Sequence, residues 1–355
     1  QIDLEMSFVD QEEEVMQITE GLLVRMFKEV RGVTLPDHFV RMPWTECMNR
    51  YGSDKPDLRF GMEIKCLDDI AGNSDFVVFK NAIADGGTVR AIVLEGGADK
   101  LSRKELDKLV EFVKTYKAKG LAWYGLGAEG VKCSFAKAVT AQELDKIAAS
   151  LGMKQGDIAL FVADKWQTAV VSLGALRCNL AARFGLYKSD DYAALWVVDF
   201  PLFEYSEEEG RFVAMHHPFT APKNEDLPYM LTDKARVRAK AYDVVINGDE
   251  MGGGSMRIYN QDVQKLMFKA LGFTDEQTQA KFGYFVEAFK YGTPPHGGLA
   301  LGLDRLVMVL TETSNIKDVI AFPKMQNASC MMTDAPAPVD DKQLDELEIA
   351  LNIKE

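Results

Sequence analysis

Apolar and polar residues alternate strictly over the first eight positions, Gln1–Phe8, with the apolar residues at the even positions. A period of two is typical of a β-strand that buries one of its faces. The polar face of this predicted strand carries Gln1, Asp3, Glu5 and Ser7. Such a face is usually solvated. It could equally form the floor of a polar cleft, because the segment that follows must cover the other face.

The segment after this strand has the period of a helix. Asp10 and Glu13 form a capping pair, acidic residues fill the first turn, and Gly32 follows the last basic residues. A single apolar stripe runs along the segment at three- and four-residue spacing and consists of Val15, Ile18, Leu22, Met26 and Val30. We therefore predict an amphipathic helix that packs this stripe on a sheet.

The middle of the chain, residues 68–188, alternates between strand-like and helix-like segments. Ser102 with Glu105, and Thr140 with Glu143, match the capping box that begins a helix. The predicted strands are residues 76–79, 89–94, 121–124 and 158–162, and a predicted helix over 166–184 closes the region. Together these elements predict a compact α+β module.

The last part of the chain, residues 189–355, returns to strands and then to helices. We expect strands at 195–200, 212–215, 242–247 and 297–301, and helices at 260–271, 275–290 and 304–310. The glycines at 252–254 predict a turn. Leu344, Leu347 and Leu351 stand at helical spacing near the end of the chain and predict a short docked helix, with a frayed acidic tail as the alternative.

Composition and charge narrow the class of protein. The 355 residues exceed one ordinary domain, and 47% hydrophobic with 27% charged residues are typical of a globular enzyme. The net charge of -13 argues against sequence-blind coating of nucleic acid, although it is compatible with a local basic patch. No uncharged apolar run approaches the roughly 20 residues that span a bilayer, so we expect no membrane segment.

The five cysteines are scattered along the chain and include no CxxC pair. An odd number of cysteines without such pairs argues against a disulfide framework and against a zinc site. This pattern favours a reducing compartment, and we therefore expect a cytoplasmic protein.

The most distinctive local feature is a run of small residues at 297–302, followed by Leu303, Asp304 and Arg305. A strand of small residues lets a flat ligand approach the backbone, and Arg305 then lies in the first turn of a helix. The planar fork of an arginine at a helix N-terminus can bind phosphate oxygens. The alternative is a glycine-rich packing contact with an ordinary Asp–Arg surface pair.

Two further groups of residues are candidates for chemistry. His216 and His217 stand side by side in a chain with only four histidines, which favours a site over a structural role, and no further ligand stands at metal-binding spacing. Asp243 and Glu250 flank a predicted hairpin, where two carboxylates can converge and hold Mg²⁺ together with phosphate oxygens. Arg257 could then pair with an anionic substrate group. A glycine-rich hairpin with solvated charges is the alternative.

Several strings in the chain match a known family. Gln1–Phe8 (QIDLEMSF) resembles the second strand of class II motif 2, and Gly298–Leu306 (GLALGLDRL) resembles motif 3. Further characteristic strings are Tyr51–Arg59 (YGSDKPDLR), Met215–Thr220 (MHHPFT), Tyr242–Arg257 (YDVVINGDEMGGGSMR), Tyr291–His296 (YGTPPH) and Ala321–Lys324 (AFPK). The chain therefore resembles the catalytic part of the bacterial aspartyl-tRNA synthetases, and the module at 68–188 resembles the domain inserted in bacterial members.

The resemblance implies an α+β fold, in which the antiparallel class II synthetase sheet is flanked by helices and carries an inserted α+β domain. Residues 1–67 and 189–355 are the implied catalytic domain, and residues 68–188 the implied insertion. The implied activity is ATP-dependent ligation of L-aspartate to tRNA through aspartyl-adenylate, with Mg²⁺, in a homodimer. The alternatives are a non-catalytic synthetase-like paralogue or fragment that binds ATP or aspartate, and an amide-forming relative that does not use tRNA.

Residue roles follow from the resemblance where positions match. The implied nucleotide and magnesium sites comprise Gly302, Leu303, Asp304, Arg305, Glu250 and Asp243, with Arg305 on the ATP phosphates. The implied aspartate site comprises Arg257, His216, His217, Gln1 and Asp3. Of these, Arg257 is implied to recognise the carboxylate of the substrate.

The chain also departs from the family pattern. It lacks the N-terminal anticodon-binding barrel, motif 1, the loop that closes over aspartate, and the first strand of motif 2 with its arginine. We therefore expect a truncated form of a longer enzyme. We also expect the truncation to impair activity, because the missing arginine is the one that the resemblance assigns to the α-phosphate of ATP.

Overall fold

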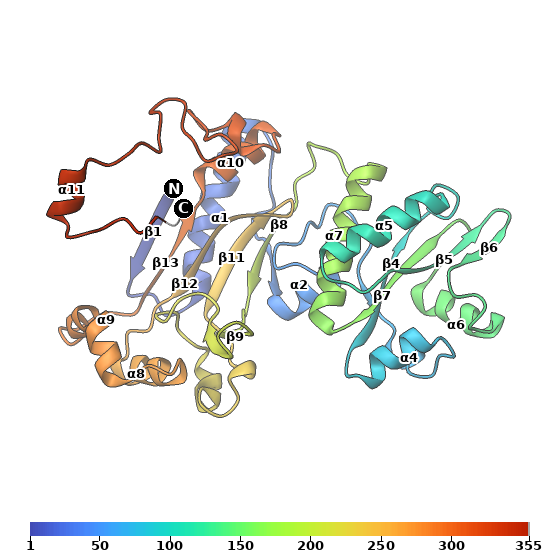
Figure 1. Cartoon of the computed structure of the whole chain (residues 1–355), viewed down its shortest axis with the longest axis horizontal. Coiled ribbons are helices and arrows are strands. Elements are labelled where there is room, and N and C mark those ends of the chain that lie inside the picture. Colours follow the sequence, from blue (N-terminus) through green and yellow to red (C-terminus); the bar gives the residue numbers. More distant parts are fainter. Residues whose placement is uncertain (354–355) are drawn as a thin grey trace. The chain divides into compact units, whose positions relative to one another are not determined.

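A computed structural model of the chain describes residues 1–353. Its internal contacts divide the chain into two compact units, Gln1–Gly302 and Leu303–Glu355. The first unit contains one sheet of six strands and another of five, each accompanied by helices (Figure 1). This arrangement confirms the expected α+β class.

The six-stranded sheet follows the order β1-β13-β12-β11-β8-β2. Its strands are β1 (Ile2–Ser7), β2 (Val40–Pro43), β8 (Ala194–Val198), β11 (Ala241–Ile246), β12 (Asp249–Met256) and β13 (His296–Leu301). All neighbouring strands are antiparallel except β2 and β8, which run parallel. The sheet thus brings the first strand of the chain beside the last strand of the first unit.

The β11–β12 hairpin turns between Asp243 and Glu250, as the sequence predicted, but the glycines at 252–254 are not part of a turn. Residues 252–254 belong to β12 and pair with both of its neighbours, so the predicted glycine turn there is wrong. The reversal occurs instead at Asn247 and Gly248, which have φ values of 57° and 88°. Asn-Gly is the pair that best tolerates two successive positive φ angles, and it makes a two-residue hairpin turn.

Helix α1 (Glu12–Arg31) begins slightly later than predicted and buries a different stripe. Glu14, rather than Glu13, accepts the backbone N–H of Gln11 at 3.3 Å. The core side of the helix carries Val15, Met16, Leu23 and Phe27, among others, whereas the predicted stripe residues Ile18, Leu22 and Val30 are exposed. Apolar residues occupy two neighbouring stripes of this helix, and the periodicity alone could not decide between them.

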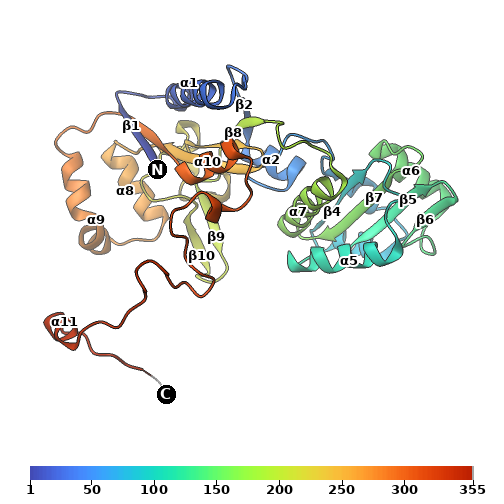
Figure 2. The same ribbon diagram turned by 90° about the horizontal axis from the view of Figure 1, so that it is seen from above.

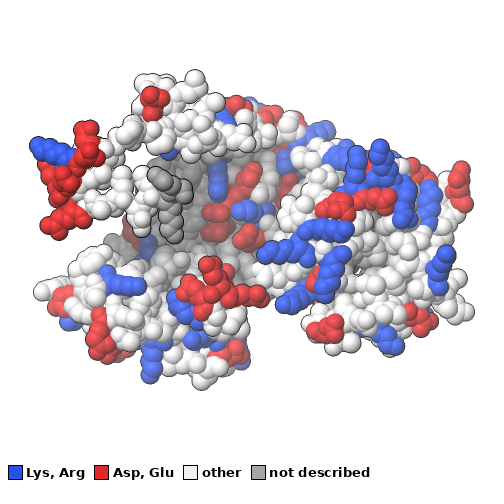
Figure 3. Space-filling view, viewed as in Figure 1, with Lys and Arg blue, Asp and Glu red and all other residues white. Residues whose placement is uncertain are grey.

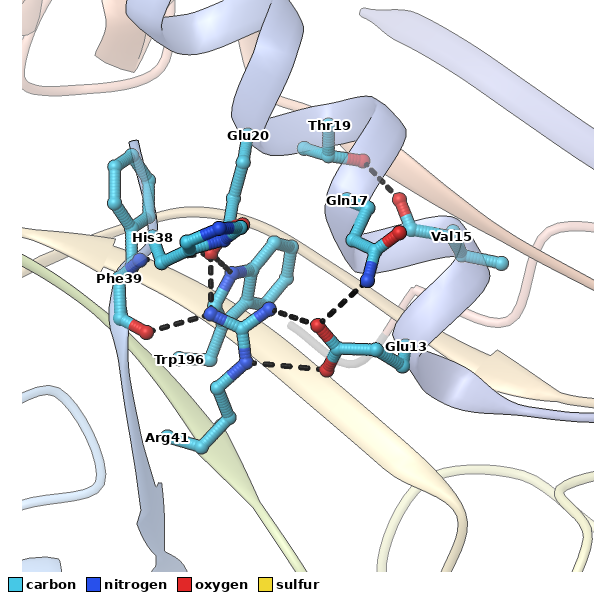
Figure 4. Close-up of polar contacts among 9 residues, drawn as sticks. All are labelled: Glu13, Val15, Gln17, Thr19, Glu20, His38, Phe39, Arg41 and Trp196. Atoms are coloured by element: carbon cyan, nitrogen blue, oxygen red, sulfur yellow. Dashed lines mark hydrogen bonds and ion pairs between the residues drawn. The ribbon is translucent and has the colours of Figure 1, made fainter. Parts of the chain in front are cut away.

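A buried ionic contact between α1 and the sheet explains which stripe faces inward. Glu20 is only 2% exposed and accepts three hydrogen bonds, from Arg41 Nη1 (2.5 Å), the N–H of Phe39 (2.9 Å) and Trp196 Nε1 (3.0 Å) (Figure 4). Burial opposes the ionisation of Glu20, but the hydrogen bonds from Arg41 and Phe39 outweigh it and lower the pKa of the carboxyl group. This contact ties α1 to β2 and β8 in one register.

The five-stranded sheet follows the order β3-β4-β7-β5-β6, with every pair antiparallel. Its strands are β3 (Lys65–Cys66), β4 (Thr88–Leu94), β5 (Ala122–Gly127), β6 (Gly130–Cys133) and β7 (Ile158–Asp164). Its helices are α3 (Asp68–Ala71), α4 (Val77–Ala84), α5 (Arg103–Thr115), α6 (Ala141–Leu151) and α7 (Trp166–Phe184). Helices begin at Ser102 and Thr140 as predicted, since each side chain caps the N–H three residues later.

Both faces of this sheet are covered by helices (Figure 2). Along β7, Ile158, Leu160 and Val162 pack in one core with α5 and α7, while Ala159 and Phe161 pack in another with α3, α4 and α6. The alternation of side chains along the strand therefore fills two cores, which explains why β7 reads as a continuous hydrophobic run.

One element of this module differs in type from the prediction. Residues 76–79 were expected to form a strand, but α4 begins at Val77. Phe79 is buried in a cluster of aromatic rings, while Val77 and Val78 are exposed. The run of β-branched and aromatic residues favours a strand locally, and packing of the phenylalanine rings overrides that preference.

The core of the five-stranded module extends beyond the predicted boundary at residue 68. The cluster formed by α5 and α7 also includes Met48, from α2 (Trp44–Tyr51), and Ile64. β3 lies at 65–66 and pairs with β4. The division into residues 1–67, 68–188 and 189–355 stays a prediction, and the shared core indicates tight coupling across its first boundary.

The remaining elements of the first unit are short strands and helices around the six-stranded sheet. They are β9 (Phe203–Ser206), β10 (Arg211–Ala214), η1 (Asn224–Tyr229), η2 (Lys234–Arg236), α8 (Gln261–Ala270) and α9 (Asp275–Phe289). None of the helices described within residues 1–353 is both long and apolar enough to cross a membrane.

The second unit is less regular. It contains α10 (Leu303–Thr311), η3 (Ile316–Asp318) and α11 (Asp341–Glu346). A short helix is present in the tail, but it ends before Leu347 and buries none of its residues. Leu347 and Leu351 are exposed, so the prediction that the leucine spacing marks a docked helix is wrong.

The close contact between α7 and the end of α2 yields a test of the fold. A Cβ at Gly174 would lie 2.5 Å from the carbonyl oxygen of Tyr51, whereas a Cβ at the helical Gly21 would meet nothing within 4 Å. We expect Gly174→Ala to lower the free energy of unfolding by about 1–3 kcal/mol through overpacking. Gly21→Ala should instead raise it by about 0.5–1 kcal/mol, because alanine is the better helix former.

Urea denaturation of the two variants and the parent measures both effects. Because each variant adds one methyl group to a helix, Gly21→Ala controls for helix propensity. A Gly174→Ala protein as stable as the parent would contradict the close approach of the two backbones.

Candidate active site

A pocket of about 540 Å³ opens on one face of the six-stranded sheet. It is lined by Asp3, Glu5, His216, His217, Asp243, Glu250, Gly253, Gly254, Ser255, Arg257, Gly298, Leu299 and Ala300. The lining therefore unites predicted site residues from β1, β11, β12 and the segment after β10. A larger pocket of about 820 Å³ lies in the five-stranded module, but none of the predicted site residues lines it.

Glycines form the floor of this pocket. A Cβ at Gly254 would overlap the carbonyl oxygen of Gly298, and a Cβ at Gly298 would overlap the carbonyl oxygen of Leu4. No other residue fits at these positions unless the strands move apart. The floor is therefore flat and made of backbone, as the sequence predicted for residues 297–302.

Asp243 and Glu250 converge above this floor, as the hairpin hypothesis predicted. Asp243 pairs with Gly253 in the β11–β12 register. A Cβ at Gly253 would overlap Oδ1 of Asp243 and would lie 3.7 Å from Oε1 of Glu250. The missing side chain at residue 253 thus makes the room that Oδ1 of Asp243 occupies, and Oε1 of Glu250 lies at ordinary contact distance from the same point.

The electrostatics of this pair suit a cation. Burial, followed by the charges of Glu250 and Asp54, raises the pKa of Asp243 to about 8. Within residues 1–353 no cluster of three or more histidine, cysteine, aspartate or glutamate side chains has metal-binding geometry. A cation at this pair would therefore need further oxygen ligands, which the phosphates of a nucleotide can supply.

Arg257 and His217 form a second polar group in the pocket. Arg257 Nη1 lies 2.5 Å from His217 Nε2, and the N–H of Phe219 lies 3.1 Å from Nδ1 of the same ring. A neutral imidazole can accept a hydrogen bond at one of its two nitrogens, whereas a protonated ring can accept none, so the donors around His217 disfavour its protonation. Burial, the guanidinium of Arg257 and the neighbouring His216 lower the pKa of His217 to about 4. The ring thus orients Arg257 without adding charge.

His216 lies beside this group and is more open to solvent. Its ring meets Phe200 edge-on, with 5.1 Å between the ring centroids. Partial desolvation lowers its pKa, and the carboxylate of Glu250 opposes that shift. The charge of His216 thus acts on His217, and that of Glu250 acts on His216.

Asp3 and Glu5, from the polar face of β1, form one wall of the pocket, so half of this face lines a cleft. Asp3 stands opposite Ala300, and Glu5 stands opposite Gly298. Gln1 does not line the pocket; its exposed side chain donates to Asp3 at 3.3 Å.

The residues of the predicted nucleotide motif are divided between the two units. Gly302 ends the first unit, and its N–H donates to the carbonyl oxygen of Met251 at 2.8 Å. Leu303, Asp304 and Arg305 lie in the first turn of α10, in the second unit. Their roles toward the phosphates stay predictions.

Two residues that bring polar side chains to the pocket, Glu5 and Ser255, were not among the predicted site residues. Glu5 has the same orientation as Asp3, two residues earlier on the strand, and Ser255 follows Gly253 in the same way. Because residues two apart on a strand face the same side, the orientation of Asp3 gives that of Glu5, and the orientation of Gly253 gives that of Ser255. The period could not show that the face of each strand is a pocket rather than open surface.

Comparison with known proteins agrees with this geometry. Residues 1–326 match the family described as tRNA synthetases class II (D, K and N). The chain therefore belongs to this family of class II tRNA synthetases.

Within the family, similar curated relatives carry a more particular name. An aspartate–tRNA ligase of Macrococcus caseolyticus is 52% identical over 354 residues, which are 100% of this chain and 60% of that relative. An aspartate–tRNA ligase of Clostridium botulinum is 54% identical over 352 residues, which are 99% of this chain and 58% of that relative. The chain thus spans about 60% of the length of the relatives it matches.

Among solved structures, an aspartyl tRNA synthetase from Entamoeba histolytica matches with a TM-score of 0.40 and 16% identity, over 92% of this chain and 43% of that one. This likeness is too distant to add to the assignment.

The pKa of His217 can be tested directly. We expect its imidazole to stay neutral as the pH falls from 7 to about 4.5, because the pKa is near 4. Arg257→Leu removes a neighbouring positive charge, so it should raise this pKa toward the ordinary value of about 6.5 while burial still holds it below. Two-dimensional NMR of the ¹⁵N-labelled imidazole rings reports the protonation state of each histidine.

The exposed His38 on the same molecule is the internal control, because it is remote in sequence from Arg257 and faces solvent. Protonation of His217 near pH 6.5 in the parent would contradict the geometry of the arginine–histidine group.

Proposed function

We propose that the protein to which this chain belongs ligates L-aspartate to tRNA at the expense of ATP, through an aspartyl-adenylate. The observation that carries this proposal is the layout of the pocket. A histidine-oriented arginine lies with a pair of converging carboxylates over one glycine floor. An arginine fork selects a carboxylate, and a carboxylate pair suits a magnesium–phosphate group.

The arginine group would hold the amino acid. The guanidinium of Arg257 pairs with the side-chain carboxylate of aspartate, and the neutral His217 keeps the fork in place. Asp3 and Glu5 line the same pocket and offer negative charge to the α-ammonium group of the substrate. The side-chain carboxylate of the substrate thus faces a positive charge, and its α-ammonium group faces negative charges.

The carboxylate pair would hold magnesium together with ATP. Burial, and after it the charges of Glu250 and Asp54, raise the pKa of Asp243, and a divalent ion at this position would favour the ionised form of the carboxyl group. When bound, this ion supplies positive charge to the phosphate oxygens. The roles of Gly302, Leu303, Asp304 and Arg305 toward the nucleotide, with Arg305 on the phosphates, are proposed from the resemblance of residues 298–306 to motif 3.

The chemistry then needs no covalent bond to the enzyme. The α-carboxylate of aspartate attacks the α-phosphorus of ATP, and pyrophosphate leaves. The terminal hydroxyl of the tRNA next attacks the carbonyl carbon of the mixed anhydride, and AMP leaves. The residues of the pocket act by holding the reactants in line and by stabilising charge. A homodimeric, cytoplasmic enzyme is the form that we propose for the whole protein.

The direct test uses the full-length protein and three amino acids. We expect ATP–pyrophosphate exchange that depends on aspartate, and charging of tRNA with aspartate. Asparagine and lysine are the controls, because the family includes enzymes for all three. Exchange driven by asparagine or lysine instead of aspartate, or no exchange with any of them, would reject the proposal.

Arg257 should determine the choice of amino acid. We expect Arg257→Leu to raise the aspartate KM at least about a hundredfold, because removing one partner of a desolvated charge pair costs roughly 2–5 kcal/mol. The KM for ATP should stay nearly unchanged. Steady-state exchange kinetics measure both constants, with Arg25→Leu on the exposed side of α1 as the control. An unchanged aspartate KM would refute this role.

Gly253 should be needed to place the carboxylate pair. Gly253→Ala puts a methyl group where Oδ1 of Asp243 lies, so we expect the exchange rate to fall at least tenfold and the Mg²⁺ concentration for half-maximal rate to rise. Gly120→Ala is the matched control, because a Cβ there meets nothing within 4 Å. The exchange rate of each variant is measured as a function of Mg²⁺ concentration. The same rate and the same half-maximal Mg²⁺ concentration in Gly253→Ala and Gly120→Ala would argue against the carboxylate site.

A further inference from the structure

The five-stranded module contains a second pocket, which lies beside α4, the start of β5 and the end of β7. We call it the α4 pocket. Its volume of about 820 Å³ exceeds the 540 Å³ of the candidate active site and lies in the range of ligand-binding pockets. The lining includes Phe76, Val78, Phe79, Lys119, Phe161 and Lys165.

One side of the α4 pocket is apolar and aromatic. Phe76, at the N-cap of α4, and Phe79 face it from the helix, and Phe161 faces it from β7. The ring centroid of Phe79 lies 4.9 Å from that of Phe76 and 5.7 Å from that of Phe161. Phe79 and Phe161 are buried, whereas Phe76 is half-buried and Val78 is exposed. A flat apolar group can therefore pack against this side.

Two lysines lie at the rim of the α4 pocket, and one buried carboxylate holds their backbones together. Asp164, which is 7% exposed, accepts the N–H of Lys119 at Oδ2 (3.2 Å) and the N–H of Lys165 at Oδ1 (2.8 Å). Both lysine side chains line the pocket and are exposed. Among residues 1–353, neither lysine has a partner in an ion pair. The lining contains one other acid, Asp85, so two exposed cations face one exposed acid.

The charge of the module favours an anionic occupant. Residues 68–188 contain 17 lysines and arginines against 14 aspartates and glutamates, a net charge of +3 in a chain whose total is -13, which leaves -16 for the rest of the chain. Figure 3 shows Lys and Arg side chains gathered over the five-stranded module. A polyanion is therefore attracted to the module and repelled by the remainder of the chain.

The combination of basic rim and aromatic side is the one that proteins use for single-stranded RNA. Lysines bind the phosphates of such a strand, and unstacked bases pack on aromatic side chains. The exposed Asn81 also lines the α4 pocket, and its amide can both donate to and accept from the edge of a base.

We propose that the α4 pocket binds an unpaired nucleotide of the tRNA, with the base against the phenylalanine side and a phosphate on Lys119 and Lys165. The five-stranded module then contributes to tRNA binding. This inference rests on the proposed function, because that function supplies tRNA as the polyanion.

Two double variants of the full-length protein test the basic rim. Lys119→Ala/Lys165→Ala removes both cations and keeps the backbone N–H groups that donate to Asp164. Lys137→Ala/Lys146→Ala is the matched control, because it removes the same charge from two exposed positions of the module that do not line the pocket.

Two single variants test the wall of the pocket. Val78→Glu places an acid in the lining, whereas Val77→Glu places the same acid one residue away, outside the lining. Both valines are exposed and lie in the first turn of α4, so the two substitutions are matched in charge and in position on the helix.

The readout is the Kd for tRNA, measured by fluorescence anisotropy over a range of salt concentrations. A blunt-ended RNA duplex serves as a probe without unpaired nucleotides, and AMP serves as a free nucleotide. The comparison of affinities needs no ligase activity.

We expect Lys119→Ala/Lys165→Ala to weaken tRNA binding at least fivefold. The slope of log Kd against log salt concentration should fall by about 1–2, because each phosphate contact on a single strand contributes roughly 0.7. Val78→Glu should also weaken binding at least fivefold. The lysine control and Val77→Glu should stay within twofold of the parent, and no variant should change the affinity for the duplex.

Parental tRNA binding by Lys119→Ala/Lys165→Ala, or an equal loss in the lysine control, would overturn the site. An equal loss of duplex binding would show that the lysines do not select unpaired nucleotides. Binding of AMP that the double variant abolishes, with unchanged binding of tRNA, would assign the pocket to a free nucleotide instead. The proposed ligase activity fails separately, if the parent shows no aspartate-dependent pyrophosphate exchange.

Discussion

The close approach of β1, β13 and β12 is the constraint on which the pocket depends. At Gly254 and Gly298 a side chain of any size would overlap the carbonyl oxygen of the neighbouring strand. The glycines therefore do two things at once. They let three strands come together, and Gly298, whose paired residues Glu5 and Ser255 line the pocket, leaves bare backbone at the pocket floor. The same absence of a side chain at Gly253 brings Asp243 and Glu250 into one space.

Two buried side chains of opposite charge, Glu20 and Arg177, each join elements that are far apart in the sequence. Glu20 joins α1 to β2 and β8 through an arginine, an indole and a backbone N–H. Arg177 joins α7 to an irregular segment through three backbone carbonyl groups. A buried charge without partners is costly, so each ion confines its partners to one arrangement. Both contacts span residues far apart in the sequence, and both determine which faces meet.

Much of the secondary structure followed from local patterns, and the exceptions are instructive. The capping residues Ser102 and Thr140 begin helices where predicted, since a side-chain oxygen and an N–H three residues later suffice to form the cap. The strand predicted at 76–79 is a helix, because the burial of Phe79 among aromatic rings outweighs the local preference of two valines. The inward stripe of α1 was also predicted wrongly. Glu20 lies on the side of the helix that faces the core, and the hydrophobic periodicity treats a glutamate as a solvent-exposed residue. The glycines of β12 suggested a turn, although the neighbouring strands require them within a sheet.

The sequence by itself determined the α+β class, most of the helices and strands, and the resemblance that named Arg257, His216, His217, Asp243, Glu250 and Asp3, all of which line one pocket. These signals are local, because a hydrophobic period, a helix cap and a sequence motif each depend only on residues close together in the chain. The tertiary structure alone decided that Glu5 and Ser255 share that pocket, that His217 lies against Arg257, and that Arg177 of α7 donates to the backbone carbonyl groups of Asp57, Phe60 and Gly61. Those relations join residues that are distant in the chain, and they depend on which faces are buried and how closely backbones approach, which no local pattern records.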